Sequence, residues 1–292
     1  MKIVNILGGL GNQMFEYAMY LALKEAHPDE EVLLCRRSYK GYHLHNGYEL
    51  DRIFDIQAPE ASLWQLAKVA YPFINYRTWQ VMRHWLPQRK SMTIADTNIQ
   101  YNYHDVIRTD SLFYDGYWQN EGYFKPIREK VLESFSFPEI LDENNRRLSA
   151  KILSKNAVSC HVRRGDYLKN QIYCVCNSHY YKEAINKMNT LVVPDLYCIF
   201  SDDITWCREN LMDIIGNKEV VFVDWNKGQN SFRDMQLMSL CEHNIIANSS
   251  FSWWGAWLND NKNKVVVAPK MWMNKELVSN PLCDSWVKVE SL

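Results

Sequence analysis

The chain has 292 residues, a formal net charge of −1 and an ordinary share of apolar and charged side chains, so it can bury a full core and is expected to form two domains. Because the net charge is near zero and the basic residues are scattered, we expect neither a basic nucleic-acid groove nor a polybasic membrane patch. The sequence contains no run of about twenty apolar residues, so we expect no transmembrane helix. We expect a soluble or peripheral protein whose partners are small molecules.

The first half begins with the alternation typical of α/β proteins. Residues 2–7 predict a strand, 8–11 a glycine turn, 14–26 a helix and 31–35 a second strand. This βαβ beginning argues for a parallel sheet covered by helices. The pattern then becomes irregular and aromatic up to about residue 137, with helices predicted at 63–69, 79–85 and 123–134.

A charged helix predicted at 142–153 follows Pro138, and we place the boundary between two domains, 1–150 and 151–292, in this region. The second half alternates more regularly, which predicts a second doubly wound sheet. Its strands are expected at 157–162, 196–200, 220–223, 244–247 and 265–268, and its helices at 180–188, 204–215, 231–241 and 252–259. Two α/β domains would enclose a cleft, a favoured place for ligands.

The eight cysteines show no paired Cys-x-x-Cys units, and no basic-plus-apolar leader precedes Lys2. Reduced thiols and a cytoplasmic location are therefore expected. Cys174 and Cys176 with His179 lack an evident fourth ligand, so we expect no metal site there.

The strongest candidate for a site lies at the end of the strand predicted at 157–162. The alternation there sends His161 and Arg163 to the same side of the sheet, just before Gly165. The planar guanidinium of arginine matches phosphate oxygens, and a glycine lets a ligand approach the backbone. The simpler alternative is a surface ion pair of Arg163 or Arg164 with Asp166.

Polar groups follow three other predicted strands of the second half. They are Ser201, Asp202 and Asp203 after the second strand, Asp224 after the third, and Ser249, Ser250 and Ser252 after the fourth. Acidic groups can accept hydrogen bonds from a base or ribose, while hydroxyl groups and amides at a helix start can hold phosphate. Any one serine, like Asp203, is explained equally well as a helix cap.

The glycine turn at 8–11 resembles a dinucleotide-binding fingerprint only in part. Gly9 and Gly11 fit the first two glycines, but Met14 occupies the place of the third. Arg36 and Arg37 follow the second strand where an acid would bind NAD, which leaves an NADP-dependent oxidoreductase as an alternative. A non-catalytic nucleotide- or glycan-binding protein is a third hypothesis. Asn12 and Gln13 could instead bind the hydroxyl groups of a substrate.

Four segments together resemble a known family. They are residues 6–15 (ILGGLGNQMF), 161–167 (HVRRGDY), 200–203 (FSDD) and 248–258 (NSSFSWWGAWL). Their order and spacing are similar to those of the α-1,2-fucosyltransferases of glycosyltransferase family 11, over nearly the whole chain. The resemblance implies a GT-B architecture of two Rossmann-like doubly wound domains facing across a cleft. It also implies a bacterial member that works on the cytoplasmic side, where peripheral contact with the membrane stays open.

The resemblance further implies transfer of L-fucose from GDP-fucose to the 2-hydroxyl of a galactose-like acceptor, with inversion and without an essential metal. Domain 151–292 would bind the donor and domain 1–150 the acceptor. Arg163 would hold the diphosphate, His161 and Asp202 the guanosine, and the turn at 249–252 phosphate. The full set of expected donor-binding residues is His161, Arg163, Asp202, Ser249, Ser250, Phe251, Ser252, Gly9, Gly11, Asn12 and Gln13.

Arg163, Asp166 and His161 are the candidates for catalysis. In a site without a metal, a guanidinium must neutralise the charge that develops on leaving GDP, and Arg163 suits this task. The acceptor hydroxyl must lose a proton, which Asp166 could take. Asp166 could equally orient an arginine, and a phosphate oxygen of the leaving group could take the proton instead.

Overall fold

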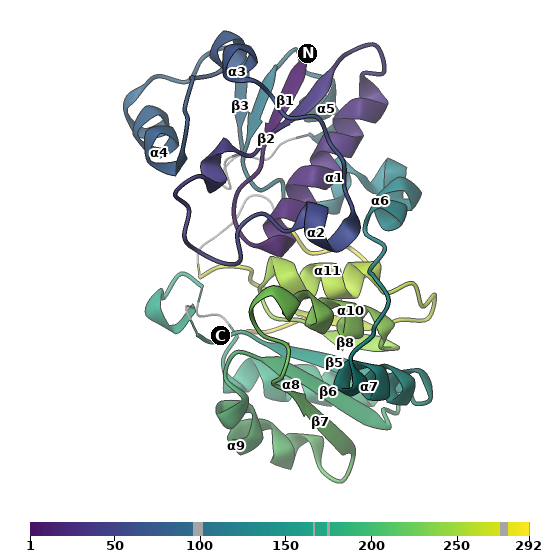
Figure 1. Ribbon diagram of the computed structural model, residues 1–292. Coiled ribbons are helices and arrows are strands. Elements are labelled where there is room, and N and C mark those ends of the chain that lie inside the picture. Colours follow the sequence, from purple (N-terminus) through teal and green to yellow (C-terminus); the bar gives the residue numbers. More distant parts are fainter. Residues whose placement is uncertain (96–101, 166, 174–175, 275–279, 292) are drawn as a thin grey trace. The chain divides into compact units, whose positions relative to one another are not determined.

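The computed structural model describes residues 1–95, 102–165, 167–173, 176–274 and 280–291 and divides into two compact units, Met1–Pro138 and Glu139–Leu292. The division falls earlier in the chain than the predicted boundary at 150. Helix α7 (Glu143–Leu153) causes the difference, because Leu148 and Ile152 pack into the core of the second unit. Figure 1 shows the elements of both units in chain order.

The first unit contains a parallel sheet with the strand order β2-β1-β4-β3. Its strands are β1 (Lys2–Asn5), β2 (Val32–Cys35), β3 (Met92–Ile94) and β4 (Phe113–Asp115). The α-helices described are α1 (Leu10–Ala26), α2 (Leu50–Phe54), α3 (Leu63–Val69), α4 (Tyr76–Trp85), α5 (Tyr103–Arg108) and α6 (Arg128–Ser134), with 3-10 turns at Arg37–Tyr39, Glu121–Tyr123 and Lys125–Ile127.

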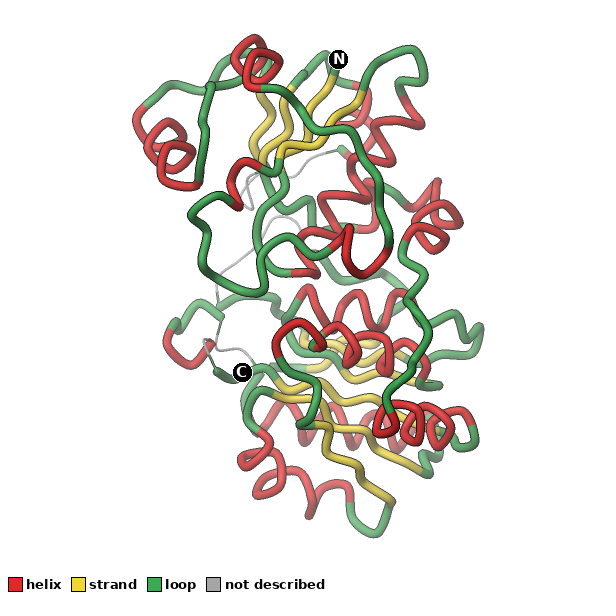
Figure 2. The backbone as a smooth tube through the Cα atoms, viewed as in Figure 1, coloured by secondary structure: helices red, strands yellow, loops and turns green. Residues whose placement is uncertain are grey.

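The second unit contains a larger parallel sheet with the order β10-β9-β8-β5-β6-β7. Its strands are β5 (Ala157–Val162), β6 (Leu196–Ser201), β7 (Glu219–Val223), β8 (His243–Ile245), β9 (Val266–Pro269) and β10 (Val287–Val289). Besides α7, its α-helices are α8 (Ser178–Leu191), α9 (Ile204–Ile215), α10 (Phe232–Leu240) and α11 (Ser250–Leu258), with 3-10 turns at Tyr167–Lys169 and Gly228–Asn230. Figure 2 distinguishes these helices and strands from the connecting loops.

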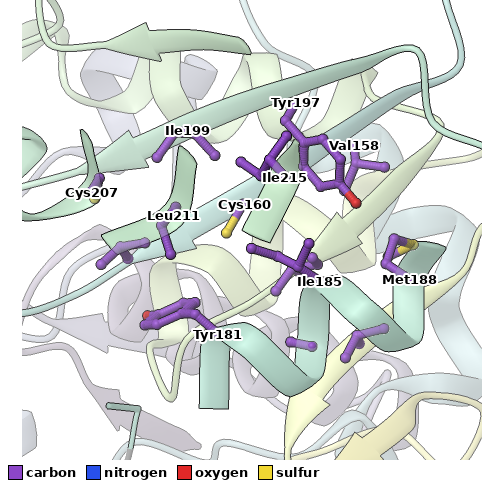
Figure 3. Close-up of a cluster of buried hydrophobic side chains, with 14 of the residues drawn as sticks. Val158, Cys160, Tyr181, Ile185, Met188, Tyr197, Ile199, Cys207, Leu211 and Ile215 are labelled. Atoms are coloured by element: carbon purple, nitrogen blue, oxygen red, sulfur yellow. The ribbon is translucent and has the colours of Figure 1, made fainter. Parts of the chain in front are cut away.

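Successive side chains of the second sheet alternate between its two faces, and each face packs against helices. Val158, Cys160 and Val162 of β5 pack with α8 and α9, in the cluster that Figure 3 shows around Tyr181, Ile185 and Leu211. Residues of the opposite parity pack against α7 and α10; they include Ala157, Leu196, Cys198 and Phe200. The prediction of two doubly wound α/β units, the composition of the GT-B class, is therefore confirmed. How the units face each other stays a prediction.

Candidate functional site

The strand order of the second unit marks the place where a ligand would bind. The chain adds β6 and β7 on one side of β5 and later places β8, β9 and β10 on the other, so the order reverses between β5 and β8. Open parallel sheets bind ligands outside the carboxyl ends of their strands at such a switch point. His161 and Arg163 lie at the end of β5, and residues 248–252 follow β8, so both predicted segments meet at this edge.

His161 contributes a buried polar group to the edge. Its ring lies 5.9 Å from the ring of Phe251, and only 7% of the residue is exposed. The Nδ1 atom is buried and has no hydrogen-bond partner among the described residues. Burial, followed by the charge of Arg163, lowers the pKa of His161 to about 4, although Asp202 acts in the opposite direction. The imidazole is therefore neutral near pH 7 and can serve a ligand as donor or acceptor.

Asp202 supports the turn that follows β5. Its Oδ2 atom lies 3.0 Å from Nη1 of Arg163, and its carboxylate also accepts the amides of Arg164 (2.9 Å) and Gly165 (3.2 Å). A Cβ atom on Gly165 would stand 2.9 Å from the same carboxylate, so a glycine suits this position. We predicted from the sequence that Asp202 holds the guanosine, but its geometry points first to orienting Arg163.

The neighbouring arginine is held differently. Arg164 donates its Nε–H to Asp203 at 3.1 Å and stacks over the ring of Trp206 at 4.1 Å. Asp203 also caps α9 by accepting the amide of Trp206 at 3.1 Å. Arg164 therefore belongs to the packing of α9. Both arginines form ion pairs, Arg163 with Asp202 and Arg164 with Asp203, and the alternative pair with Asp166 stays a prediction. Asp166, the predicted base or positioning residue, lies outside the described residues.

The N-terminus of α11 lies at the same edge and is suited to an anion. Ser249 is the N-cap residue but makes no side-chain capping bond, and the first turn contains no acidic residue. The amides of Ser250, Phe251 and Ser252 therefore lack the usual capping group. Helix amides of this kind bind phosphate readily. The hydroxyl of Ser252 is turned back toward backbone carbonyls, the nearer being that of Ser249 at 3.3 Å.

Two residues that were not assigned a binding role from the sequence, Tyr167 and Asn248, connect these parts. The hydroxyl of Tyr167 donates to the carbonyl of Asn248 at 3.3 Å, and the guanidinium of Arg163 lies 5.5 Å from the Tyr167 ring centre. The side-chain amide of Asn248 anchors the turn by donating two hydrogen bonds of 3.0 Å to backbone carbonyls. Its buried Oδ1 has no hydrogen-bond partner among the described residues. Both residues stand inside the segments that carry the family resemblance, which was the available signal.

The glycine turn of the first unit also lies at a switch point, between β1 and β4. Gly8 has φ +96°, and Gly9 is the N-cap of α1, which begins at Leu10. Asn12 accepts a hydrogen bond from the Gln119 side chain at 2.8 Å. The Gly9, Gly11 and Asn12 segment is therefore placed where a ligand of this unit would bind.

Gln13 differs from its prediction. The side chain is fully buried, and its amide donates to the carbonyls of Gly8 (3.0 Å) and Gly47 (2.8 Å). Its oxygen accepts the amide of Glu49 at 2.8 Å. Both N–H groups are thus engaged by the protein, because Gln13 fixes the loop that contains Gly47. This geometry favours a structural role over the predicted contact with a donor.

The NADP alternative loses one of its two candidate phosphate ligands, Arg36, whereas the buried Nε of Arg37 has no hydrogen-bond partner among the described residues. Arg36, which follows β2, pairs with Asp51 at 2.7 Å and with Glu60 at 3.0 Å, and its guanidinium lies over the ring of Tyr48. In the described part of the chain, no group of three histidine, cysteine or acidic residues could hold a metal ion, and no helix is long and apolar enough to cross a membrane.

Two Rossmann-like units, the second with an arginine and helix amides at its switch point, are the composition of the GT-B class of α/β proteins. The comparisons with known proteins agree. The model for glycosyl transferase family 11 matches residues 85–290. The chain belongs to this family of glycosyltransferases.

Relatives extend over almost the whole chain. An alpha-1,2-colitosyltransferase of Escherichia coli is 32% identical, covering 99% of this chain and 98% of the relative. A galactoside alpha-(1,2)-fucosyltransferase 2 of Oryctolagus cuniculus is 25% identical, covering 88% of this chain and 67% of the relative. Among solved structures, the fucosyltransferase NodZ from Bradyrhizobium aligns with a TM-score of 0.48 at 12% identity, covering 87% of this chain and 90% of that one.

Proposed function

We propose that the protein transfers L-fucose from GDP-fucose to the 2-hydroxyl of a terminal galactose-like acceptor, with inversion at the anomeric carbon. The observation that carries this proposal is the edge of the second sheet, where Arg163, braced by Asp202, meets the uncapped N-terminus of α11. Such an arrangement suits the diphosphate of a sugar nucleotide. Membership of family 11 and the fucosyltransferase relative support the choice of donor.

Each group at this edge has a task in the proposed reaction. As the bond between fucose and GDP breaks, negative charge grows on the diphosphate, and Arg163 and the first amides of α11 stabilise it. Neutral His161 offers a hydrogen bond to the nucleotide from a desolvated position. The acceptor hydroxyl attacks from the opposite face and releases its proton either to Asp166 or to a phosphate oxygen.

The proposal assigns the two substrates to different units. The second unit binds GDP-fucose, and the first unit binds the galactoside. Gly9, Gly11 and Asn12, which the sequence assigned to the donor, lie at the switch point of the first unit and are reassigned here to the acceptor. Peripheral contact with a membrane and a cytoplasmic location are compatible with this assignment.

We further propose that the reaction needs no metal, since Arg163 and the α11 amides neutralise the leaving group. Turnover in EDTA should equal turnover in magnesium or manganese. Activity that disappears in EDTA and returns with either metal would overturn this part of the proposal.

A second candidate is transfer of colitose, which the relative with 32% identity favours. Colitose is fucose without the 3-hydroxyl, so the two donors differ in one polar group. A site that hydrogen-bonds this hydroxyl discriminates strongly against a donor that lacks it, whereas a site that ignores it accepts both.

The deciding experiment compares GDP-fucose, GDP-colitose, GDP-mannose and UDP-galactose as donors, with a panel of galactosides as acceptors and the linkage of the product determined. We expect kcat/KM for GDP-fucose to exceed that for GDP-colitose by at least about tenfold. The reverse order would assign the protein to colitosyl transfer. Binding of GDP without turnover of any donor would favour the non-catalytic alternative, and thermal stabilisation by NADP but not by GDP the oxidoreductase.

A further inference from the structure

A stretch without acidic residues covers α3 and α4 in the first unit. Residues 61–95 include Lys68, Arg77, Arg83, Arg89 and Lys90, and they contain no aspartate or glutamate. The chain as a whole has a net charge of −1. Five of the 33 lysines and arginines lie in this segment, so the basic residues are scattered along the chain as expected. The segment is positive because it lacks acidic residues.

Helix α4 displays an outward face that mixes cationic and apolar side chains. None of its ten residues is buried. Arg77, Val81, His84 and Trp85 recur at the spacing of one helix face, and Val81 is 57% and Trp85 76% exposed. Soluble helices normally place such large apolar groups against the core.

The other face of α4 fixes how the helix is turned. Trp79 and Met82 pack against the core cluster that also contains residues of α3 and β3. Arg83 stacks on the Trp79 ring at 5.0 Å and pairs with the buried Asp115 at 3.2 Å. The exposure of Val81 and Trp85 thus follows from how α4 packs on the unit.

Helix α3 adds to the same region, as Figure 1 shows near β3. Its Trp64 is 82% exposed. Arg89, which follows α4, donates to the carbonyls of Ala67 and Lys68 at 2.9 Å, so the end of α3 and the segment after α4 touch. Ile74 and Leu86 are also half exposed, at 50% and 45%.

We propose that this α3–α4 surface binds an anionic phospholipid bilayer. Tryptophan rings settle at the boundary between headgroups and acyl chains, and lysine and arginine are attracted to anionic lipid. The complete lack of acidic residues in 61–95 matches an anionic surface. Exposed aliphatic side chains favour lipid over single-stranded nucleic acid, which needs flat rings for stacking. The inference is independent of the donor and acceptor proposed above.

Co-sedimentation with vesicles tests the proposal on the full chain. Vesicles of phosphatidylcholine with about one third phosphatidylglycerol should bind the protein, and binding should weaken in high salt. The double variant Arg77→Gln/Lys90→Gln should bind about 25-fold more weakly, because each basic residue contributes about fivefold. Trp64→Ala/Trp85→Ala should lose about tenfold, since both rings leave the interface.

The control variants remove exposed lysines or exposed apolar side chains of the second unit. Lys182→Gln/Lys187→Gln alters two exposed lysines of α8, and Leu141→Ala/Val193→Ala shortens two exposed apolar side chains. These variants should bind like the original chain. Circular dichroism should show that every variant is folded, which is expected because all of the positions are exposed.

Several results would overturn the proposal. Binding to neutral vesicles that equals binding to anionic ones would remove the role of charge. Equal losses in the control variants would place the contact elsewhere. Self-association, or binding of single-stranded RNA, that disappears in the α3–α4 variants while vesicle binding persists unchanged would assign the surface to that other partner.

Discussion

Arg163 presents a planar guanidinium at the end of β5, held 3.0 Å from Asp202. Replacing it with lysine keeps the charge but removes the forked geometry that matches phosphate oxygens. We expect kcat/KM for GDP-fucose to fall about a hundredfold or more. Arg164→Lys is the control, because Arg164 is tied to Asp203 and Trp206, and its turnover should change little. Near-normal turnover of Arg163→Lys would move the phosphate role to another residue.

Asp202 allows its two suggested roles to be separated. If it braces Arg163 and the amides of Arg164 and Gly165, Asp202→Asn should weaken binding of both GDP and inorganic pyrophosphate, by about tenfold or more. If it holds the guanosine, only GDP binding should weaken. Calorimetric titration of both ligands distinguishes the two. Asp203→Asn retains the α9 cap and serves as the control, with little change expected for either ligand.

His161 should make stability depend on pH. Its pKa is about 4 in the folded chain and near 6.5 when unfolded, so the unfolded chain binds more protons between these values. Above pH 6.5 the ring is neutral in both states and does not change the free energy of unfolding. Between pH 6.5 and 4 the free energy of unfolding falls as the pH drops, by up to about 3 kcal/mol.

Denaturant unfolding of the original chain and His161→Gln at pH 7 and pH 4.5 measures this effect. Other carboxyl groups titrate in the same window, so the quantity to compare is the difference between the two proteins. That difference should shift in favour of His161→Gln at pH 4.5. A difference that stays constant with pH would show that burial does not hold the imidazole neutral.

At the scale of one element, the N-terminus of α11 can be altered by a single amide. Ser250 is the first helical residue, and Ser249 has an extended backbone, so proline is tolerated at 250. Ser250→Pro removes one N–H and should weaken GDP binding about tenfold, with little change in melting temperature. Ser250→Ala keeps the backbone amide and removes only the hydroxyl, so it measures the contribution of the side chain. Equal losses in both variants would assign the contact to the side chain.

The second unit was predictable where its strands are long and buried, as in β5 and β6 with six residues each. Strand β10 has three residues, none of them buried, and was not predicted from the sequence. The ranges expected for β5 and α9 match those observed, and alternation correctly placed Val158 and Cys160 opposite His161. In the first unit, β3 and β4 have three residues each, too few for alternation to show. Their parallel partners are distant in the chain, so only tertiary pairing defines them.

The site was predictable in its composition and less so in its contacts. Spacing predicted that His161 and Arg163 lie close together, and the charge of Arg163 does act on the imidazole of His161. Spacing could not show that Asp202 pairs with Arg163 or that the Gln13 amide donates to the carbonyls of Gly8 and Gly47. Those contacts depend on how distant loops pack.

On the scale of the whole molecule, donor binding should affect the two units unequally. Hydrogen exchange with GDP present should slow most at 161–165 and 248–252, which form the edge of the second sheet. At a hundredfold excess over Kd, binding adds about 2.7 kcal/mol to the stability of the unit that holds the ligand. Segments 2–35 should change little. Protection concentrated in 2–35 instead would assign the nucleotide to the first unit.

Helix α11 is firmly anchored by buried tryptophan side chains. Trp253, Trp254 and Trp257 are buried, and the Trp253 ring lies 5.4 Å from that of Trp286. A helix wedged by four indoles cannot easily tilt or shift, so its leading amides keep their direction whether or not a ligand is bound. In the proposed reaction, these fixed amides would stabilise the departing diphosphate without the reorganisation that water needs, because folding has already oriented them.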